Sequence, residues 1–83
     1  MYQIILSQNA KKFLKKLNKQ ISNRIIKTIE RLRFRPEAHS TKLIGQKIYK
    51  LRSGDYRIIF SINKGILQIL IIKIDHRKKI YKR

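Results

Sequence analysis

The chain has 83 residues, of which 22 are Lys or Arg and four are Asp or Glu, giving a formal net charge of +18. Because it contains no cysteine, disulfide bonds, thiolate zinc sites and cysteine nucleophiles are excluded. The four carboxylates are too few and too dispersed for an obvious two-metal hydrolase, and no apolar run approaches the ~18 residues of a membrane span. We expect one domain over residues 1–83 with no membrane partner, and the lack of cysteine is compatible with either redox compartment.

The positive charge is spread over both halves of the chain and is not collected in a tail. Hydrophobic residues, mainly isoleucine, make up 42% of the sequence, which favours a packed domain over disorder. Charge of this size repels itself within a compact chain and attracts polyanions. The composition therefore predicts a folded domain that binds nucleic acid or an acidic protein.

The N-terminal half has the pattern of a strand followed by two helices. Residues 2–6 are apolar and β-branched, which favours a strand, and Ser7 can cap the helix after it. Two apolar stripes with helical spacing follow: Ala10, Phe13, Leu14 and Leu17, then Ile21, Ile25, Ile29 and Leu32. Asn18 separates the two stripes and Pro36 ends the second, so we expect a helical hairpin.

The C-terminal half has the pattern of three strands joined by tight turns. Residues 47–52, 56–62 and 66–74 are rich in strand-forming residues. Ser53-Gly54 and Asn63-Lys64-Gly65 separate them, and glycine allows the positive φ of a tight reversal. We expect an α+β fold of order β-α-α-β-β-β, with the helical hairpin packed on one face of a mostly antiparallel four-stranded sheet.

The expected register divides this sheet into two faces. It pairs Lys50 with Arg57 and Leu51 with Tyr56. In the next hairpin it pairs Ile62 with Ile66, so that Arg57 lies near Ile71 and Asp55 near Lys73. The helix-facing side then carries Tyr49, Leu51, Tyr56, Ile58, Phe60, Leu70, Ile72 and Ile74. The other side carries Lys50, Arg52, Arg57, Lys73, Asp75 and Arg77, above Ile59, Ile69 and Ile71.

Like charges that face each other across strands cost stability. The predicted cationic face therefore indicates a bound phosphate backbone, although the sheet of so basic a chain also collects cations by chance.

Three sequence blocks carry a resemblance to a known family. They are Lys42-Leu43-x-Gly45, then Tyr49-Lys50-Leu51-Arg52-Ser53-Gly54-Asp55-Tyr56-Arg57-Ile58-Ile59-Phe60, and finally Asp75-His76-Arg77-Lys78-Lys79-Ile80-Tyr81. In these blocks, and in length and element order, the chain resembles the RelE/ParE toxin superfamily. The resemblance implies a RelE-like fold and the toxin of a type II toxin–antitoxin pair, a cytoplasmic protein that needs no metal and no cofactor. RelE-type toxins are ribosome-dependent endoribonucleases that cleave messenger RNA in the A site and are held inactive by an antitoxin.

The resemblance also implies roles for single residues. Cleavage through the 2′-hydroxyl needs a base, charge stabilisation at the phosphorane and an acid for the departing 5′-oxygen. Lys50 matches a lysine that acts as base or stabilises the phosphate, and Arg57 matches the arginine at the scissile phosphate. Arg77 matches an arginine that acts as electrostatic stabiliser and proton donor. Tyr81 matches a tyrosine that stacks on or orients the nucleotide. His76 could substitute as general acid. We assign RNA and ribosome contacts to Lys42, Arg52, Lys73, Lys78 and Lys79.

Two positions depart from the family pattern. Ile48 stands where some RelE enzymes carry a second lysine, and Asp75 stands in place of the usual glycine. Asp75 could pair with Arg77 and weaken its field. These departures affect the division of labour among the residues more than the reaction class.

Two other functions stay open at this point. One is a ParE-like toxin that inhibits DNA gyrase without nuclease activity, and the other is a non-enzymatic basic protein that binds nucleic acid. The expected partners are the ribosome, messenger RNA and a cognate antitoxin with an acidic or amphipathic wrapping segment. This segment would cover the basic sheet face or displace the residues around Tyr81. If its affinity did not respond to salt, the apolar groove of the helical hairpin would be the better docking site.

Overall fold

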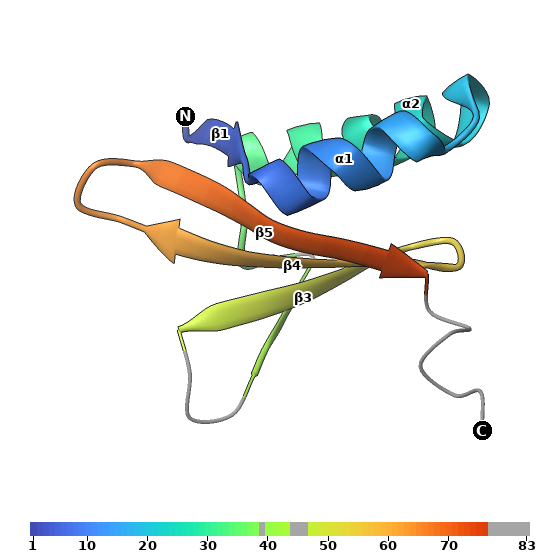
Figure 1. The fold of residues 1–83 in the computed structure, drawn as a ribbon. Coiled ribbons are helices and arrows are strands. Elements are labelled where there is room, and N and C mark those ends of the chain that lie inside the picture. Colours follow the sequence, from blue (N-terminus) through green and yellow to red (C-terminus); the bar gives the residue numbers. More distant parts are fainter. Residues whose placement is uncertain (39, 44–46, 77–83) are drawn as a thin grey trace.

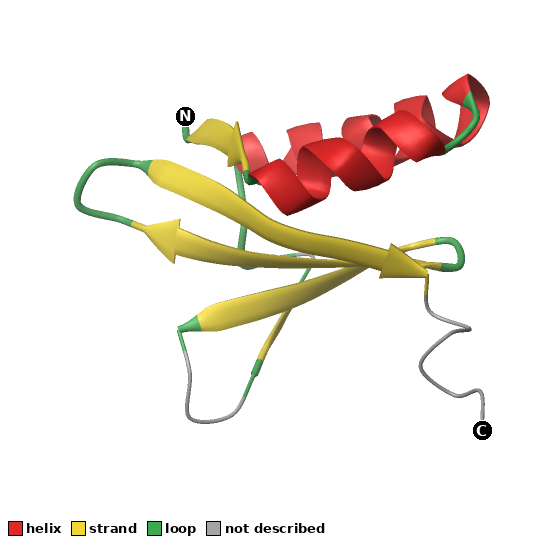
Figure 2. Cartoon of the chain, viewed as in Figure 1, coloured by secondary structure: helices red, strands yellow, loops and turns green. Residues whose placement is uncertain are grey.

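A computed structural model describes residues 1–38, 40–43 and 47–76 of the chain. Its elements, in chain order, are β1 (Gln3–Leu6), α1 (Gln8–Lys16), α2 (Lys19–Glu30), the 3-10 helix η1 (Arg31–Arg33), β2 (Thr41–Lys42), β3 (Ile48–Ser53), β4 (Tyr56–Asn63) and β5 (Gln68–His76). The two helices form one layer that covers one face of the sheet (Figures 1 and 2). The predicted α+β fold is confirmed. No helix in the described ranges is both long enough and apolar enough to cross a membrane.

The sheet has five strands in the order β1-β5-β4-β3-β2, one more than predicted. β1 runs parallel to β5, and all other neighbours are antiparallel. This order arises because the helical hairpin carries the chain from β1 to the far side of the sheet, and three successive antiparallel pairings, β2–β3, β3–β4 and β4–β5, then bring it back beside β1. The additional strand, β2, has only two residues, which is too short for the alternation that reveals a strand in a sequence.

Both helices begin at a side-chain cap. Ser7 Oγ accepts a hydrogen bond from the amide of Ala10 at 3.1 Å, and Asn18 Oδ1 accepts one from the amide of Ile21 at 3.0 Å. The predicted cap at Ser7 is therefore confirmed. Its hydroxyl also donates to the carbonyl of Ile72 at 2.7 Å, so this one side chain both starts α1 and ties it to β5.

We expect Ser7→Ala to lower the free energy of unfolding by about 1–2 kcal/mol, because it removes a helix cap and leaves the Ile72 carbonyl without this donor. Urea unfolding followed by circular dichroism measures the change. Ser22→Ala is the matched control, since Ser22 Oγ donates only to the Lys19 carbonyl within α2, and it should cost less than about 0.5 kcal/mol. Equal losses in the two variants would contradict a stabilising link between α1 and β5.

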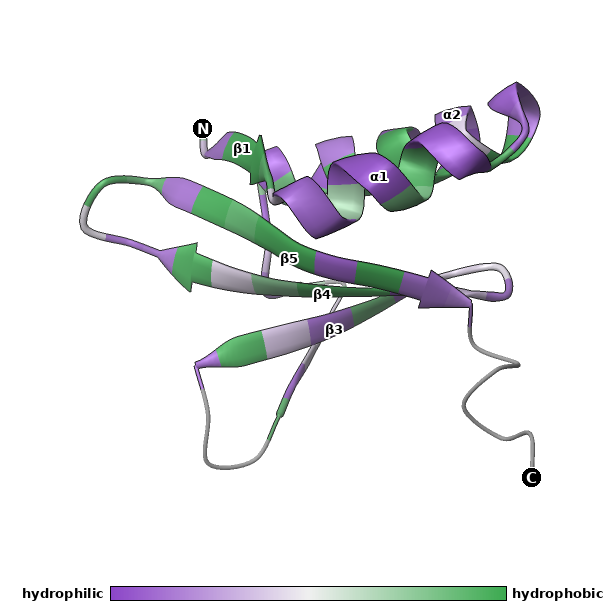
Figure 3. Cartoon of the chain, viewed as in Figure 1, coloured by the Kyte–Doolittle hydropathy of each residue, from purple (hydrophilic) through white to green (hydrophobic). Residues whose placement is uncertain are grey.

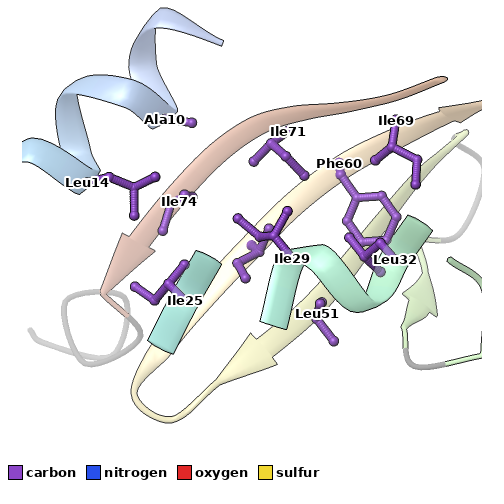
Figure 4. Packing of buried hydrophobic residues seen from close by; sticks show 11 residues of the cluster. Ala10, Leu14, Ile25, Ile29, Leu32, Leu51, Phe60, Ile69, Ile71 and Ile74 are labelled. Atoms are coloured by element: carbon purple, nitrogen blue, oxygen red, sulfur yellow. The ribbon is translucent and has the colours of Figure 1, made fainter. Parts of the chain in front are cut away.

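The hydrophobic core lies between the helices and the sheet (Figure 4). Its buried residues are Ala10, Leu14, Ile25, Ile29, Leu32, Leu51, Ile58, Phe60, Ile69, Ile71 and Ile74. Both predicted helical stripes contribute to it, with Phe13, Leu17 and Ile21 packed at its border. The core therefore uses one face of the sheet only and leaves the other face without helices.

The β3–β4 hairpin closes two residues away from the expected register. Ser53 pairs with Tyr56 across a two-residue turn in which Gly54 has a φ of +60°. Arg57 consequently pairs with Arg52, and the predicted pairing with Lys50 is wrong. The predicted faces survive, because a shift of two residues returns each side chain to its own side.

The β4–β5 register differs more from the prediction. Asn63 pairs with Gln68, which leaves a loop of residues 64–67 in place of 63–65. The side chain of Asn63 organises this loop by accepting hydrogen bonds from the amides of Gly65 and Ile66 at 3.0 and 3.2 Å. A β-bulge next to Ile59 and Phe60 then shifts the register once more.

These two shifts redistribute the side chains of β5. Ile69 and Ile71 are fully buried in the core, whereas Leu70 is 39% exposed and Ile72 lies outside the buried cluster, so the predicted faces of these four residues are wrong. The bulge adds a residue and thereby restores the predicted faces beyond it. Ile74 is buried in the core as expected. Lys73 and Asp75, which flank Ile74 in the strand, project from the opposite face of the sheet.

Candidate nucleic-acid interface

The helix-free face of the sheet, here called the open face, gathers charged side chains from three neighbouring strands. Two rows cross β3, β4 and β5: Arg52–Arg57–Asp75, and beside it Lys50–Ile59–Lys73. The rows are two residues apart on every strand, so both project from the same side. We call Lys50, Arg52, Arg57 and Lys73 the cationic cluster. In Figure 3 the C-terminal part of β5 alternates between hydrophilic and hydrophobic colour, which fits a strand that has one side on the core and the other on the open face.

The pairing partner of Arg57 on β5 is Asp75, where the sequence predicted Ile71 nearby. Asp75 lies 3.5 Å from Arg57 Nε and 3.5 Å from Lys73 Nζ. The Arg57 side chain is 27% exposed and that of Asp75 is 21% exposed, so the pair is partly shielded from water. Asp75 thus contacts two members of the cluster. The expected partner, Arg77, lies outside the described residues, and so do Lys78, Lys79 and Tyr81. The predicted proximity of Asp55 to Lys73 is wrong, because Lys73 pairs with Ile59.

His76 projects from the opposite side of β5 to Asp75. It pairs with Tyr56, and the two rings meet edge to face with their centroids 4.9 Å apart. Tyr56 in turn makes an edge-to-face contact with Phe13 of α1, at 6.0 Å. The structure therefore places His76 among the aromatic residues on the helix side and does not bring it to the cationic cluster.

Lys42 also lies apart from the cluster. In β2 it pairs with Tyr49, whereas its neighbour Thr41 pairs with Lys50. Lys42 lines a cavity of about 590 Å³ together with Lys47, Tyr49, Ser61, Ile62, Asn63 and Lys64. Lys47 and Lys64 were not predicted for this cavity, since they are far apart in the sequence and only the β3–β4 pairing brings them together.

A carboxylate partly neutralises this second group of lysines. Glu37 accepts a hydrogen bond from the Tyr49 hydroxyl at 3.2 Å and lies 3.2 Å from Lys64 Nζ. The hydrogen bond from Lys64 is the main reason that the pKa of Glu37 falls below its ordinary value. The pKa of Tyr49 is raised mainly by partial burial and, to a smaller extent, by its hydrogen bond to Glu37. The arrangement holds the loop after η1 against the sheet.

The described residues contain no group of three or more His, Cys, Asp or Glu side chains that could hold a metal ion. What the open face offers instead is four cations on rigid strands, with guanidinium groups suited to phosphate oxygens. By fold and surface, the chain is a small α+β protein with a cationic cluster on the open face of its sheet.

Comparison with protein families identifies it further. The model of the ParE toxins of type II toxin–antitoxin systems matches residues 4–81. The chain therefore belongs to this toxin family, within the RelE/ParE superfamily, and the resemblance read from the sequence is confirmed. No curated protein matches the chain significantly.

Solved structures of RelE toxins share the fold. A chain of the RelE–RelB complex from Pyrococcus horikoshii has a TM-score of 0.81 and 29% identity, covering 92% of this chain and 94% of that one. A chain of the RelB–RelE complex from Methanococcus jannaschii has a TM-score of 0.71 and 27% identity, covering 93% of this chain and 94% of that one. A chain of the RelBE2 complex from Mycobacterium tuberculosis has a TM-score of 0.82 and 23% identity, covering 92% of this chain and 98% of that one. At this identity the match shows a shared fold.

Proposed function

We propose that this toxin is a metal-independent, ribosome-dependent endoribonuclease that cleaves messenger RNA in the A site. The observation that carries the proposal is the cationic cluster on the open face. Arg52 and Arg57 are directly opposite each other, with Lys50 and Lys73 in the adjacent row. Facing like charges destabilise a sheet by roughly 0.2–1 kcal/mol per pair. A phosphate backbone would neutralise them and is the ligand that this face fits best.

The reaction needs proton transfer and charge stabilisation at one phosphate. The 2′-oxygen attacks the adjacent phosphorus and its proton passes to a base, while the bond from phosphorus to the 5′-oxygen breaks and that oxygen receives a proton. We assign the base to Lys50. Arg57 stabilises the phosphorane, because its planar guanidinium binds two oxygens at once. The proton donor Arg77 and the stacking Tyr81 are assigned from the family resemblance.

Primer-extension mapping of a message on translating ribosomes tests this function. Cuts at fixed positions within codons support the ribonuclease. Inhibition of DNA supercoiling without such cuts supports a gyrase inhibitor. If neither cuts nor inhibition is observed, the function that remains is that of a basic nucleic-acid-binding protein. Free message without ribosomes, incubated under the same conditions, tests the ribosome dependence.

Gyrase inhibition is the second candidate, because the family model that matches residues 4–81 is that of the ParE toxins. The retained Lys50 and Arg57 argue against it, since by the resemblance ParE-type toxins generally lack the nuclease residues. The supercoiling assay decides between the two.

A cognate antitoxin is the partner that we infer for this chain, because several similar solved structures are complexes of RelE with RelB. The open face offers it a mixed surface. Beside the cationic cluster, Ile5 pairs with Leu70, and these side chains are 36% and 39% exposed. An amphipathic segment with acidic residues matches both parts of this face.

We expect the affinity for the antitoxin to fall about tenfold or more between roughly 0.1 and 0.5 M NaCl, because added salt screens the contacts to the cationic cluster. Isothermal titration calorimetry of the purified pair measures this change. An affinity that does not respond to salt would indicate that the antitoxin binds in the apolar groove of the helical hairpin and not on the cationic cluster.

A further inference from the structure

Asp75 is the carboxylate that lies within the cationic cluster. The others are placed elsewhere: Glu30 pairs with Arg33, Glu37 contacts Tyr49 and Lys64, and Asp55 lies in the β3–β4 turn. The carboxylate of Asp75 is 3.5 Å from both Arg57 Nε and Lys73 Nζ. It therefore takes a place that an oxygen of a bound phosphate would otherwise take.

The contact between Asp75 and Arg57 is an ion pair of poor hydrogen-bond quality. Arg57 Nε and Asp75 Oδ1 are both shielded from solvent, and neither has a hydrogen-bond partner within the part of the chain that the structure describes. A buried donor without a partner costs roughly 1–3 kcal/mol. Asp75 thus balances the charge of Arg57 without a hydrogen bond to its Nε, and a better-placed oxygen could replace the carboxylate.

We propose that Asp75 is a specificity-determining residue that makes the cluster a poor site for free RNA. This inference rests on the proposed function for its substrate. The carboxylate competes with phosphate for Arg57 and Lys73, so a flexible RNA, which also loses conformational freedom on binding, binds weakly. RNA whose phosphates are already held in position, as on a ribosome, does not pay that ordering cost and displaces the carboxylate.

The same residue stabilises the empty protein. Arg52 and Arg57 face each other on β3 and β4, and Asp75 is the next residue in that row, on β5. Its negative charge offsets a repulsion that otherwise opposes strand pairing. Removing the charge should therefore have two opposite effects: the fold becomes less stable and the affinity for RNA increases.

Binding of a fluorescent single-stranded 2′-O-methyl RNA of about 12 nucleotides, followed by anisotropy in about 0.1 M salt, tests the proposal. The probe cannot react through a 2′-hydroxyl, so the measurement is independent of nuclease activity. We expect Asp75→Asn to bind about tenfold more tightly than the wild type, since one nearby negative charge is lost, and to melt at a lower temperature. Asp75→Glu keeps the charge and should bind as weakly as the wild type.

Glu30→Gln is the matched control, because it makes the same change in net charge on α2, away from the open face. It should change the affinity by less than about twofold. An equal gain in Glu30→Gln, or an unchanged or weaker affinity in Asp75→Asn, would overturn the proposal. If Asp75→Asn does not fold, Asp75→Thr provides the same test with a residue that favours strands. If Asp75→Asn binds the probe more tightly but the wild type makes no codon-positioned cuts, the proposed function is refuted and this inference stands.

Discussion

Arg57→Ala is expected to lower the rate of codon-positioned cleavage by about 100-fold or more. Removing one preorganised donor from a developing oxyanion typically costs this much, and Arg57 has charged cross-strand partners on both sides, Arg52 and Asp75. Arg57→Lys keeps the charge but loses the planar fork, so it should restore the activity only in part. Primer extension with a time course on translating ribosomes measures all three proteins.

The matched control for this prediction is Arg31→Ala. Arg31 is an exposed arginine in η1, on the helix side of the molecule, and its loss should change the cleavage rate by less than about threefold. Thermal melts of each variant separate a loss of chemistry from a loss of folded protein. Cuts that persist at the wild-type rate in Arg57→Ala would remove this residue from the reaction.

Ile71→Ala is expected to lower the free energy of unfolding by about 2–4 kcal/mol, whereas Leu70→Ala should lower it by less than about 1 kcal/mol. Ile71 is fully buried in the core, and Leu70 is 39% exposed on the open face. Both changes remove a large aliphatic side chain from adjacent positions of one strand. The difference between them therefore reports the register of β5 and not its composition. Equilibrium unfolding in urea, monitored by circular dichroism, measures both values.

The opposite ranking, with Leu70→Ala the more damaging, would show that the register expected from the sequence is correct and that the four-residue loop is not formed. It would also change the alignment of Arg57 with Asp75, because both pairings belong to the same β4–β5 ladder. This pair of variants consequently tests the structural basis of the candidate site without measuring its activity.

The helical half of the fold was predictable because its determinants are local. Ser7 and Asn18 each accept a hydrogen bond from a residue three positions later, and the apolar stripes repeat with the period of the helix itself. The cations of the site were also predictable. Lys50, Arg52 and Arg57 lie within one eight-residue block, and a shift of the β3–β4 hairpin by two residues leaves them on the same face.

The place of His76 in the sheet does not support the role that its motif suggested. A histidine beside the arginine of the terminal motif suggested a general acid, but strand alternation places His76 on the side opposite to Asp75, next to Tyr56. For residues 69–72, alternation could assign the side only once the position of the bulge was known, and the bulge depends on contacts with β4. No nearby residue signals it.

The amino-acid sequence by itself determined the charge, the two capped helices, the number of long strands and the family to which the chain belongs, since each of these depends on composition or on neighbours along the chain. Only the tertiary structure decided that Asp75 lies beside Arg57 and Lys73, that Ile71 rather than Leu70 is buried, and that β2 exists. These features depend on which residues face each other across strands. Cross-strand pairing is set by loop length, by the bulge and by packing against the helices. A shift of one residue in the register reverses the faces of a strand.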